Sequence, residues 1–354
     1  MPTDVSKAFA TYAHYLDAAV HIADRTHNSQ YYDGSFARGL VTEKRVVRGV
    51  LTAVRKTLSQ KEIQARAPGN GDAMRLSLQS AWGTELVIAL AQDVMPRETL
   101  ALHCQWAVVQ AYYAVHQATR ALAYAVGQDK ALTSHPSTQN FFRSMWCDSR
   151  YGVAPLNVSY GPSGPTNVPT QATKPVSNLA TVSHLNAWPV FLMGLRTTHE
   201  RARSEVISNA RANKARDIRK RWRTEEEARL TRGMRPRKEP NFSNHPTLVA
   251  AERTRVIASV RATTLIDFLY RLRIGSNYED ATVYYEGPSS DIDAWAFMDR
   301  LRIVTALTLA ASEALIRSYV GKKRFDPMVQ SWIAGKSQKV TRGTLLERAP
   351  LLLS

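Results

Sequence analysis

Long segments of this chain repeat apolar residues every three or four positions, and this periodicity constrains the fold more than any other feature. Such spacing places the apolar side chains on one face of an α-helix. An alternating pattern, typical of a β-strand, is found only in ATVYYE at 281–286. The sequence therefore predicts an all-α protein, with helices over residues 5–27, 42–66, 73–92, 97–126, 184–232, 291–320 and 325–334, and a helical pattern that resumes at Leu248.

The segment 97–126 is the most apolar of these predicted helices. Its large side chains, Trp106 and Tyr113 among them, cover most of the circumference, which predicts a central core helix. Gly127 is expected to end this helix, because glycine readily adopts the left-handed conformation that closes many helices. Ser134 then indicates the start of another helix.

The charge of the chain is strongly basic and unevenly distributed. The formal net charge is +17, and the segment between Arg196 and Lys238 contains 15 Lys or Arg against 6 Asp or Glu. This segment alone therefore carries +9, about half of the excess. Because a positive field of this size attracts phosphate polymers, nucleic acid is the expected partner.

Within this basic segment, four cations recur at spacings of three and four and would share one helix face. Trp222 lies beside them in the sequence and can stack on a base. A solvated helix whose cations pair with the acidic run Glu225–Glu227 is the alternative interpretation. The predicted nucleic-acid contacts of this helix are Arg216, Arg219, Lys220, Arg223 and Trp222.

Other features of the sequence indicate the cellular compartment of the protein and whether it needs a metal ion or a cofactor. No stretch of about 18 apolar residues lacks charge, so no membrane span is expected, and the N-terminus does not have the layout of a signal peptide. Cys104 and Cys147 form no CxxC pair and are expected to be reduced thiols of a cytoplasmic protein. No Gly-rich phosphate loop, HExxH or paired metal carboxylates occur, so neither a metal ion nor a cofactor is predicted.

Two separated segments, residues 110–142 and 269–287, contain residues that together resemble the HEPN-domain superfamily. The first has Tyr-Tyr-Ala, Arg-Ala-Leu, a Gly and a Ser-His before an apolar helix. The second has an Arg followed five positions later by a Tyr, and then an apolar helix. The matching residues are Tyr112, Tyr113, Ala114, Arg120, Ala121, Leu122, Gly127, Ser134, His135, Phe142, Arg273 and Tyr278.

The resemblance implies a HEPN-like helical bundle with additional N-terminal helices, interrupted by a long basic helical insertion. Such domains usually keep the two matching segments close together, whereas about 125 residues separate them here. The expected divisions are N-terminal helices at 1–95, the first half of the core at 96–146, a flexible loop at 147–182, the basic insert at 183–244, the second half of the core at 245–335 and a C-terminal tail at 336–354.

The resemblance also implies a function directed at RNA, in bacterial toxin–antitoxin or phage-defence systems. HEPN nucleases cut RNA without metal, using an Arg and a His four to six residues apart that usually meet across a homodimer. The Arg stabilises charge on the phosphate and the His moves the 2′-hydroxyl proton. No His stands at that spacing here, and the catalytic candidates are Arg273, Asn277 and Tyr278.

Three functions follow from these observations. The first is a nucleic-acid-binding protein, with RNA favoured, in which Arg271 and Arg273 contact phosphate. The second is a metal-independent RNA endonuclease that uses a substitute base, and the third is a non-catalytic adaptor subunit. In all of them His116 is interpreted as a satisfied core histidine, and His135 as a residue that helps to cap a helix.

Overall fold

The chain divides into two compact units in this computed structural model. Unit 1 comprises Met1–Ser159, Pro165–Leu195 and Thr264–Ser354, and unit 2 comprises Tyr160–Gly164 and Arg196–Thr263. The structure describes residues 5–28, 43–59, 68–128, 132, 134–148, 151–169, 182–183, 185–240, 246–279, 281–288, 290–334 and 344–354.

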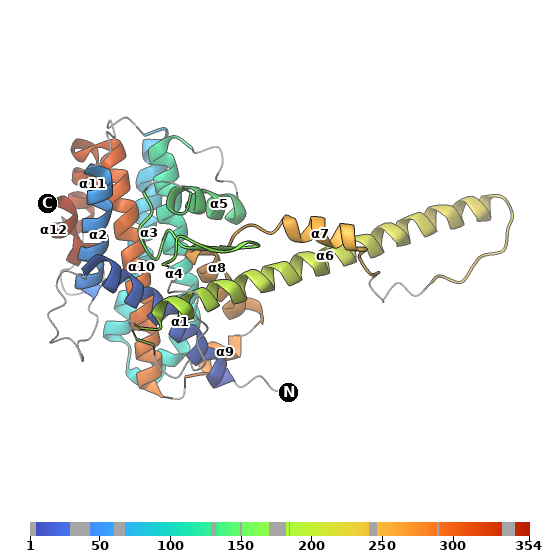
Figure 1. Cartoon of the computed structure of the whole chain (residues 1–354), viewed down its shortest axis with the longest axis horizontal. Coiled ribbons are helices and arrows are strands. Elements are labelled where there is room, and N and C mark those ends of the chain that lie inside the picture. Colours follow the sequence, from blue (N-terminus) through green and yellow to red (C-terminus); the bar gives the residue numbers. More distant parts are fainter. Residues whose placement is uncertain are drawn as a thin grey trace. The chain divides into compact units, whose positions relative to one another are not determined.

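Helices account for most of the described residues, which confirms the all-α class (Figure 1). The described part of the chain also contains one turn of π-helix, Gly275–Glu279, and two strands of three residues each, β1 (Ser159–Gly161) and β2 (Gly164–Thr166). The helices are α1 (Val5–Asn28), α2 (Glu43–Ser59), α3 (Gly71–Val94), α4 (Arg97–Val126), α5 (His135–Trp146), α6 (Ala187–Thr231), α7 (Ala250–Ala258), α8 (Leu265–Ile274), α9 (Ala281–Tyr285), α10 (Asp291–Val320), α11 (Lys322–Ala334) and α12 (Leu345–Leu353).

Unit 1 is built around α4 and α10, which pack against each other and against α3 (Figure 1). Along α10 the side chains from Leu301 to Ile316 are almost all buried. This helix is long and apolar enough to cross a membrane, but 89% of its most apolar stretch is buried inside the protein, as in a core helix. The prediction that α4 is a core helix holds for most of its residues but is wrong for Trp106, which is 56% exposed.

Single residues determine where α3 and α5 begin and where α4 ends. The Asn70 side chain accepts a hydrogen bond from the backbone N–H of Ala73 and so caps α3. Ser134 caps α5 through the backbone N–H of Ser137. Gly127 ends α4 at a φ of 78°, a conformation that side-chain-bearing residues adopt at a cost. These contacts place the ends of α3, α4 and α5 within a residue or two of the positions that the sequence predicts.

Three predictions about local structure differ from what the structure shows. The segment ATVYYE, which alternates like a strand, forms α9, since its residues 281–285 are helical. The helical pattern that resumes at Leu248 is interrupted at 259–264 between α7 and α8. There Thr263 exchanges two backbone hydrogen bonds of 2.8 Å with Tyr160 in unit 2. The predicted loop at 147–182 likewise contains the hairpin of β1 and β2, and its residues 170–181 lie outside the described part.

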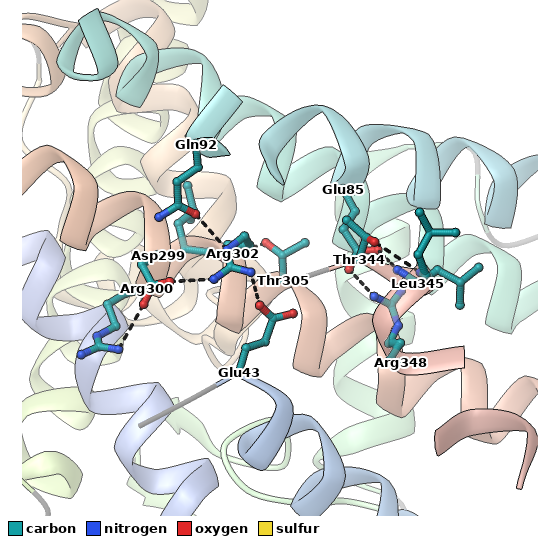
Figure 2. Close-up of polar contacts among 12 residues, drawn as sticks. Glu43, Glu85, Gln92, Asp299, Arg300, Arg302, Thr305, Thr344, Leu345 and Arg348 are labelled. Carbon is teal, nitrogen blue, oxygen red and sulfur yellow. Dashed lines mark hydrogen bonds and ion pairs between the residues drawn. The ribbon is translucent and has the colours of Figure 1, made fainter. Parts of the chain in front are cut away.

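Two arginines are buried among carboxylates in unit 1 (Figure 2). The guanidinium of Arg302 donates to Glu43, to Asp299 at 2.7 Å and to Gln92 at 2.9 Å. These partners belong to α2, α10 and α3, so one side chain links three helices. Since a buried charge is stable only when it is paired and hydrogen-bonded, this cluster fixes how the helices pack.

The second buried arginine is Arg348 of α12. It donates to Glu85 of α3 at 2.5 Å and, through two nitrogens, to Glu313 of α10 at 2.6 and 2.8 Å. Glu313 also accepts from the indole N–H of Trp82 at 2.8 Å. The region predicted as a C-terminal tail therefore includes a helix whose charged side chain lies in the middle of unit 1.

Unit 2 consists mainly of α6 from Arg196 onward, followed by α7. Lys214 of α6 pairs with Glu252 of α7 at 2.7 Å. Farther along α6, Glu226 accepts from the backbone and the side chain of Arg237, both at 2.6 Å. These pairs tie the segments that follow α6 back onto the same helix.

Candidate functional site

The two segments that carry the family resemblance pack together in unit 1, because α8 contacts both α4 and α5. Arg273, in the last turn of α8, lies among three tyrosine rings. Its guanidinium carbon is 5.2, 5.6 and 5.7 Å from the ring centroids of Tyr113, Tyr270 and Tyr112. Nη2 also donates to the Tyr113 hydroxyl at 3.1 Å. Cation–π contacts of this kind hold a guanidinium in place without neutralising its charge.

Two histidines complete the same cluster. His135, the first residue of α5, has its Nδ1 2.8 Å from the hydroxyl oxygen of Tyr112. The ring centroid of His135 lies 4.9 Å from that of His116, a residue of α4. We refer to the seven side chains of this region as the Arg273 cluster: Tyr112, Tyr113, His116, Arg120, His135, Tyr270 and Arg273.

His116 is 8% exposed, and neither of its ring nitrogens has a hydrogen-bond partner among the described residues. The prediction of a satisfied core histidine is therefore right about burial and wrong about hydrogen bonding. The role predicted for His135 is wrong as well, since Ser134 caps α5 and His135 bonds to Tyr112. Leaving a buried polar group unpaired costs about 1–3 kcal/mol, which is uncommon without a functional reason.

The cluster has positive charge without a matching carboxylate. In the described part of the chain, neither Arg273 nor Arg120 has an Asp or Glu within ion-pair distance, and Arg120 donates instead to the Tyr124 hydroxyl at 2.9 Å. No Asp or Glu occurs in the sequence from Thr99 to Gln128. An anion that reaches the cluster would therefore meet two unpaired guanidinium groups.

Burial and these cations set the protonation of the two imidazoles. Burial, then the positive charges of His135, Arg120 and Arg273, lowers the pKa of His116 to about 4. Burial and Arg273 also lower the pKa of His135. Both rings are therefore uncharged at neutral pH. Burial raises the pKa of Tyr112, so its hydroxyl stays uncharged, and its oxygen can accept a hydrogen bond from Nδ1–H of a neutral His135, a tautomer that leaves the lone pair on Nε2.

The other catalytic candidates lie close to Arg273 in the chain. Asn277 belongs to the π-helical turn and is half-buried, and the Tyr278 side chain lies outside what the structure describes. The Gln105 side chain donates to the backbone oxygen of Ser276 at 2.8 Å, which fastens this turn to α4. Arg271 is half-buried on α8. The structure thus supplies His135 and His116 as neighbours of Arg273, where the sequence offered Asn277 and Tyr278.

The predicted nucleic-acid contacts of the basic segment all lie on α6, in unit 2. Arg216 donates to Asn213, and Arg223 lies 3.8 Å from Glu239. Trp222 is half-buried, with the guanidinium of Arg237 5.9 Å from its ring centroid. The four cations Arg216, Arg219, Lys220 and Arg223 are exposed to solvent.

A search of the described residues for groups of three or more His, Cys, Asp or Glu that could hold a metal ion found none. Comparisons of the chain with protein-family models, with curated proteins and with solved structures found no match.

Proposed function

We propose that this protein binds RNA and cleaves it without a metal ion, with Arg273 and His135 as the reacting pair. The observation that carries the proposal is the position of His135 in the Arg273 cluster. An unpaired guanidinium and an uncharged imidazole lie in the same cluster, and both contact the pair Tyr112 and Tyr113. The two groups come from α8 and α5, so a histidine need not follow the arginine in the sequence.

Each group has a defined task in the proposed reaction. Arg273 binds the phosphate and stabilises the negative charge that develops on its oxygens. Nε2 of neutral His135 takes the proton of the 2′-hydroxyl. The 2′-oxygen then attacks phosphorus, the bond to the 5′-oxygen breaks, the departing oxygen takes a proton from water, and the hydroxide that remains takes the proton back from His135. The products are a 2′,3′-cyclic phosphate and a 5′-hydroxyl.

His116 has a supporting role in this proposal. Its ring lies against His135 and within the electrostatic reach of Arg120 and Arg273. An incoming phosphate would offset the positive charges that lower its pKa and would give its unpaired nitrogens a partner. His116 is therefore a positioning residue, and His135 is the base.

The test is cleavage of a labelled RNA oligonucleotide in EDTA, with the cyclic phosphate product identified by mass. His135→Ala and Arg273→Lys should each lower kcat by about 10²–10³, the usual loss when one group that stabilises a transition state is removed. Lys keeps the charge but not the planar fork or the stacking. Arg75→Ala, at an exposed cation of α3, is the matched control and should cleave normally.

Equal cleavage by the wild type and both variants would refute the proposal. RNA binding without cleavage is the second candidate, and the lowered pKa of His135, caused by burial and then by Arg273, favours it, because it makes this imidazole a weaker base. Intact RNA at high protein excess, together with affinity that falls as salt rises, would establish that candidate instead. An affinity that does not change with salt would contradict both candidates and favour an adaptor subunit.

A further inference from the structure

From Trp106 to Arg120, α4 is buried except along one narrow stripe, whereas nearer its start Leu102 is 62% exposed and Ala101 and Gln105 are half-buried. The open positions follow the alternating spacing of three and four residues that keeps side chains on one face of a helix. We call this set the α4 stripe: His103, Trp106, Gln110, Tyr113, Gln117 and Arg120.

The chemistry of the stripe suits a single nucleic-acid strand. It combines aromatic rings, which stack on bases, with amides, which bond to base edges, and with one arginine. The stripe has no carboxylate, since Asp and Glu are absent from Thr99 to Gln128. A protein partner held by ion pairs would find a cation at only one end of the stripe, whereas a polyanion meets no carboxylate that belongs to α4 itself.

Trp106 is the most exposed aromatic side chain of the stripe, with 56% of its surface open. A large indole left in water forgoes burial worth about 1.5–3 kcal/mol, so its position favours a ligand. His103 lies on the same stripe one turn earlier, with its Nε2 buried, and burial lowers the pKa of this imidazole and keeps it uncharged at neutral pH.

Trp106 stands seven residues before Tyr113, which contacts Arg273. Two helical turns of this kind span about 10.5 Å and return to almost the same direction around the axis. Because stacked nucleotides rise by about 3.4 Å each, this distance equals about three nucleotides. A strand whose phosphate lies at Arg273 therefore reaches the indole within a few nucleotides.

We infer that Trp106 is a base-stacking subsite, and that the substrate of the Arg273 cluster is single-stranded RNA lying along the α4 stripe. This inference rests on the proposed function for the position of the phosphate. Bases inside a duplex are already stacked on each other and cannot lie flat on an indole, so the subsite selects unpaired RNA.

The test measures affinity for a strand that cannot be cleaved, so that it does not depend on catalysis. A 2′-O-methyl RNA octamer, single-stranded or annealed to its complement, is titrated into wild type, Trp106→Ala and Trp106→Phe. Ala should weaken single-strand binding about 5- to 150-fold, the strength of one base–aromatic stack, and Phe should restore most of it. Leu76→Ala, at an equally exposed apolar residue of α3, is the control and should bind as wild type does.

Unchanged affinity of Trp106→Ala for the single strand would overturn the inference, as would equal affinity of the wild type for the duplex. The proposed function is tested separately, by the cleavage assay with His135→Ala and Arg273→Lys, so its failure can be distinguished from the failure of this inference. A wild type that binds the uncleavable strand through Trp106 but cuts no RNA would support the subsite and refute only the cleavage step.

Discussion

Replacing Arg348 by Met should destabilise unit 1 by an amount that depends strongly on pH. The guanidinium makes three hydrogen bonds to Glu85 and Glu313, and all three side chains are 3% exposed or less. Burial already raises the pKa of Glu85 to about 7 although Arg348 opposes the shift. At pH 7 the wild type therefore already carries much of this cost for Glu85, and the added cost of losing the cation falls on the second buried carboxyl, Glu313, which accepts two of the three hydrogen bonds.

The size of the destabilisation by Arg348→Met follows from the ordinary pKa of 4.5 for a glutamate. Protonating one carboxyl against pH 7 costs about 3.4 kcal/mol, at about 1.36 kcal/mol per pH unit. At pH 5 the same step costs about 0.7 kcal/mol. The free energy of unfolding of Arg348→Met should therefore lie about 3–5 kcal/mol below that of the wild type at pH 7, the usual cost of breaking a buried ion pair, and close to it at pH 5.

Urea denaturation followed by circular dichroism at both pH values measures this difference. Arg324→Met, at an exposed cation of α11, is the control and should change the free energy by less than about 0.5 kcal/mol. A deficit that is the same at pH 5 and pH 7, or smaller than about 1 kcal/mol at pH 7, would refute the reasoning.

The wild type should itself lose stability as the pH rises. Burial raises the pKa of both Glu85 and Glu43 in the folded state to about 7, so their contribution is complete below about pH 4.5 and is lost up to about pH 7, which urea denaturation across this range would measure. For RNA cleavage, the acid limb of kcat/KM should have its midpoint below pH 6.5, because the pKa of His135 is lowered; a limb centred above that pH would contradict its role as base. Ser134→Ala should lower the free energy of unfolding by about 1 kcal/mol in urea denaturation, and no change would mean that the cap of α5 contributes nothing. Replacing four cations of α6 by Gln should reduce the salt dependence of RNA affinity by a log–log slope of as much as about 2.8, whereas an unchanged slope would mean that none of them touches phosphate: Arg216, Arg219, Lys220 and Arg223.

The helices could be predicted because their signals are local. The bounds of α4 match the prediction at both ends, since Pro96 and Gly127 act on the backbone next to them. The break between α7 and α8 could not be predicted, because Thr263 pairs with Tyr160, about 100 residues earlier in the chain. Trp106 was misjudged for a different reason. Polar residues at helical spacing, such as Gln110 and Gln117, mark the open side of α4, but the aromatic Trp106 among them has the composition of a core residue.

The candidate site could be predicted only in part, because it depends on contacts between distant residues. The resemblance supplied Arg273 as well as Tyr112, Tyr113 and His135, but nothing local joins them. The resemblance implies a histidine four to six residues from Arg273 in the sequence. The histidine that the fold places near Arg273 is instead His135, which lies on another helix. The Ser-His match at the start of α5 was the one signal that pointed to it.

The order of synthesis gives the divided unit 1 a further consequence. Unit 2 separates α5 from α8 in the chain, so His135 leaves the ribosome about 140 residues before Arg273. At usual translation speeds, roughly 7 to 28 s pass between them. During that time the nascent chain contains Tyr112, Tyr113 and both histidines of the Arg273 cluster. It does not yet contain Arg273, whose guanidinium is the group proposed to bind the phosphate. A polypeptide released before Arg273 therefore lacks one of the two groups of the proposed reaction, and the Arg273 cluster is complete only after most of the protein has been made.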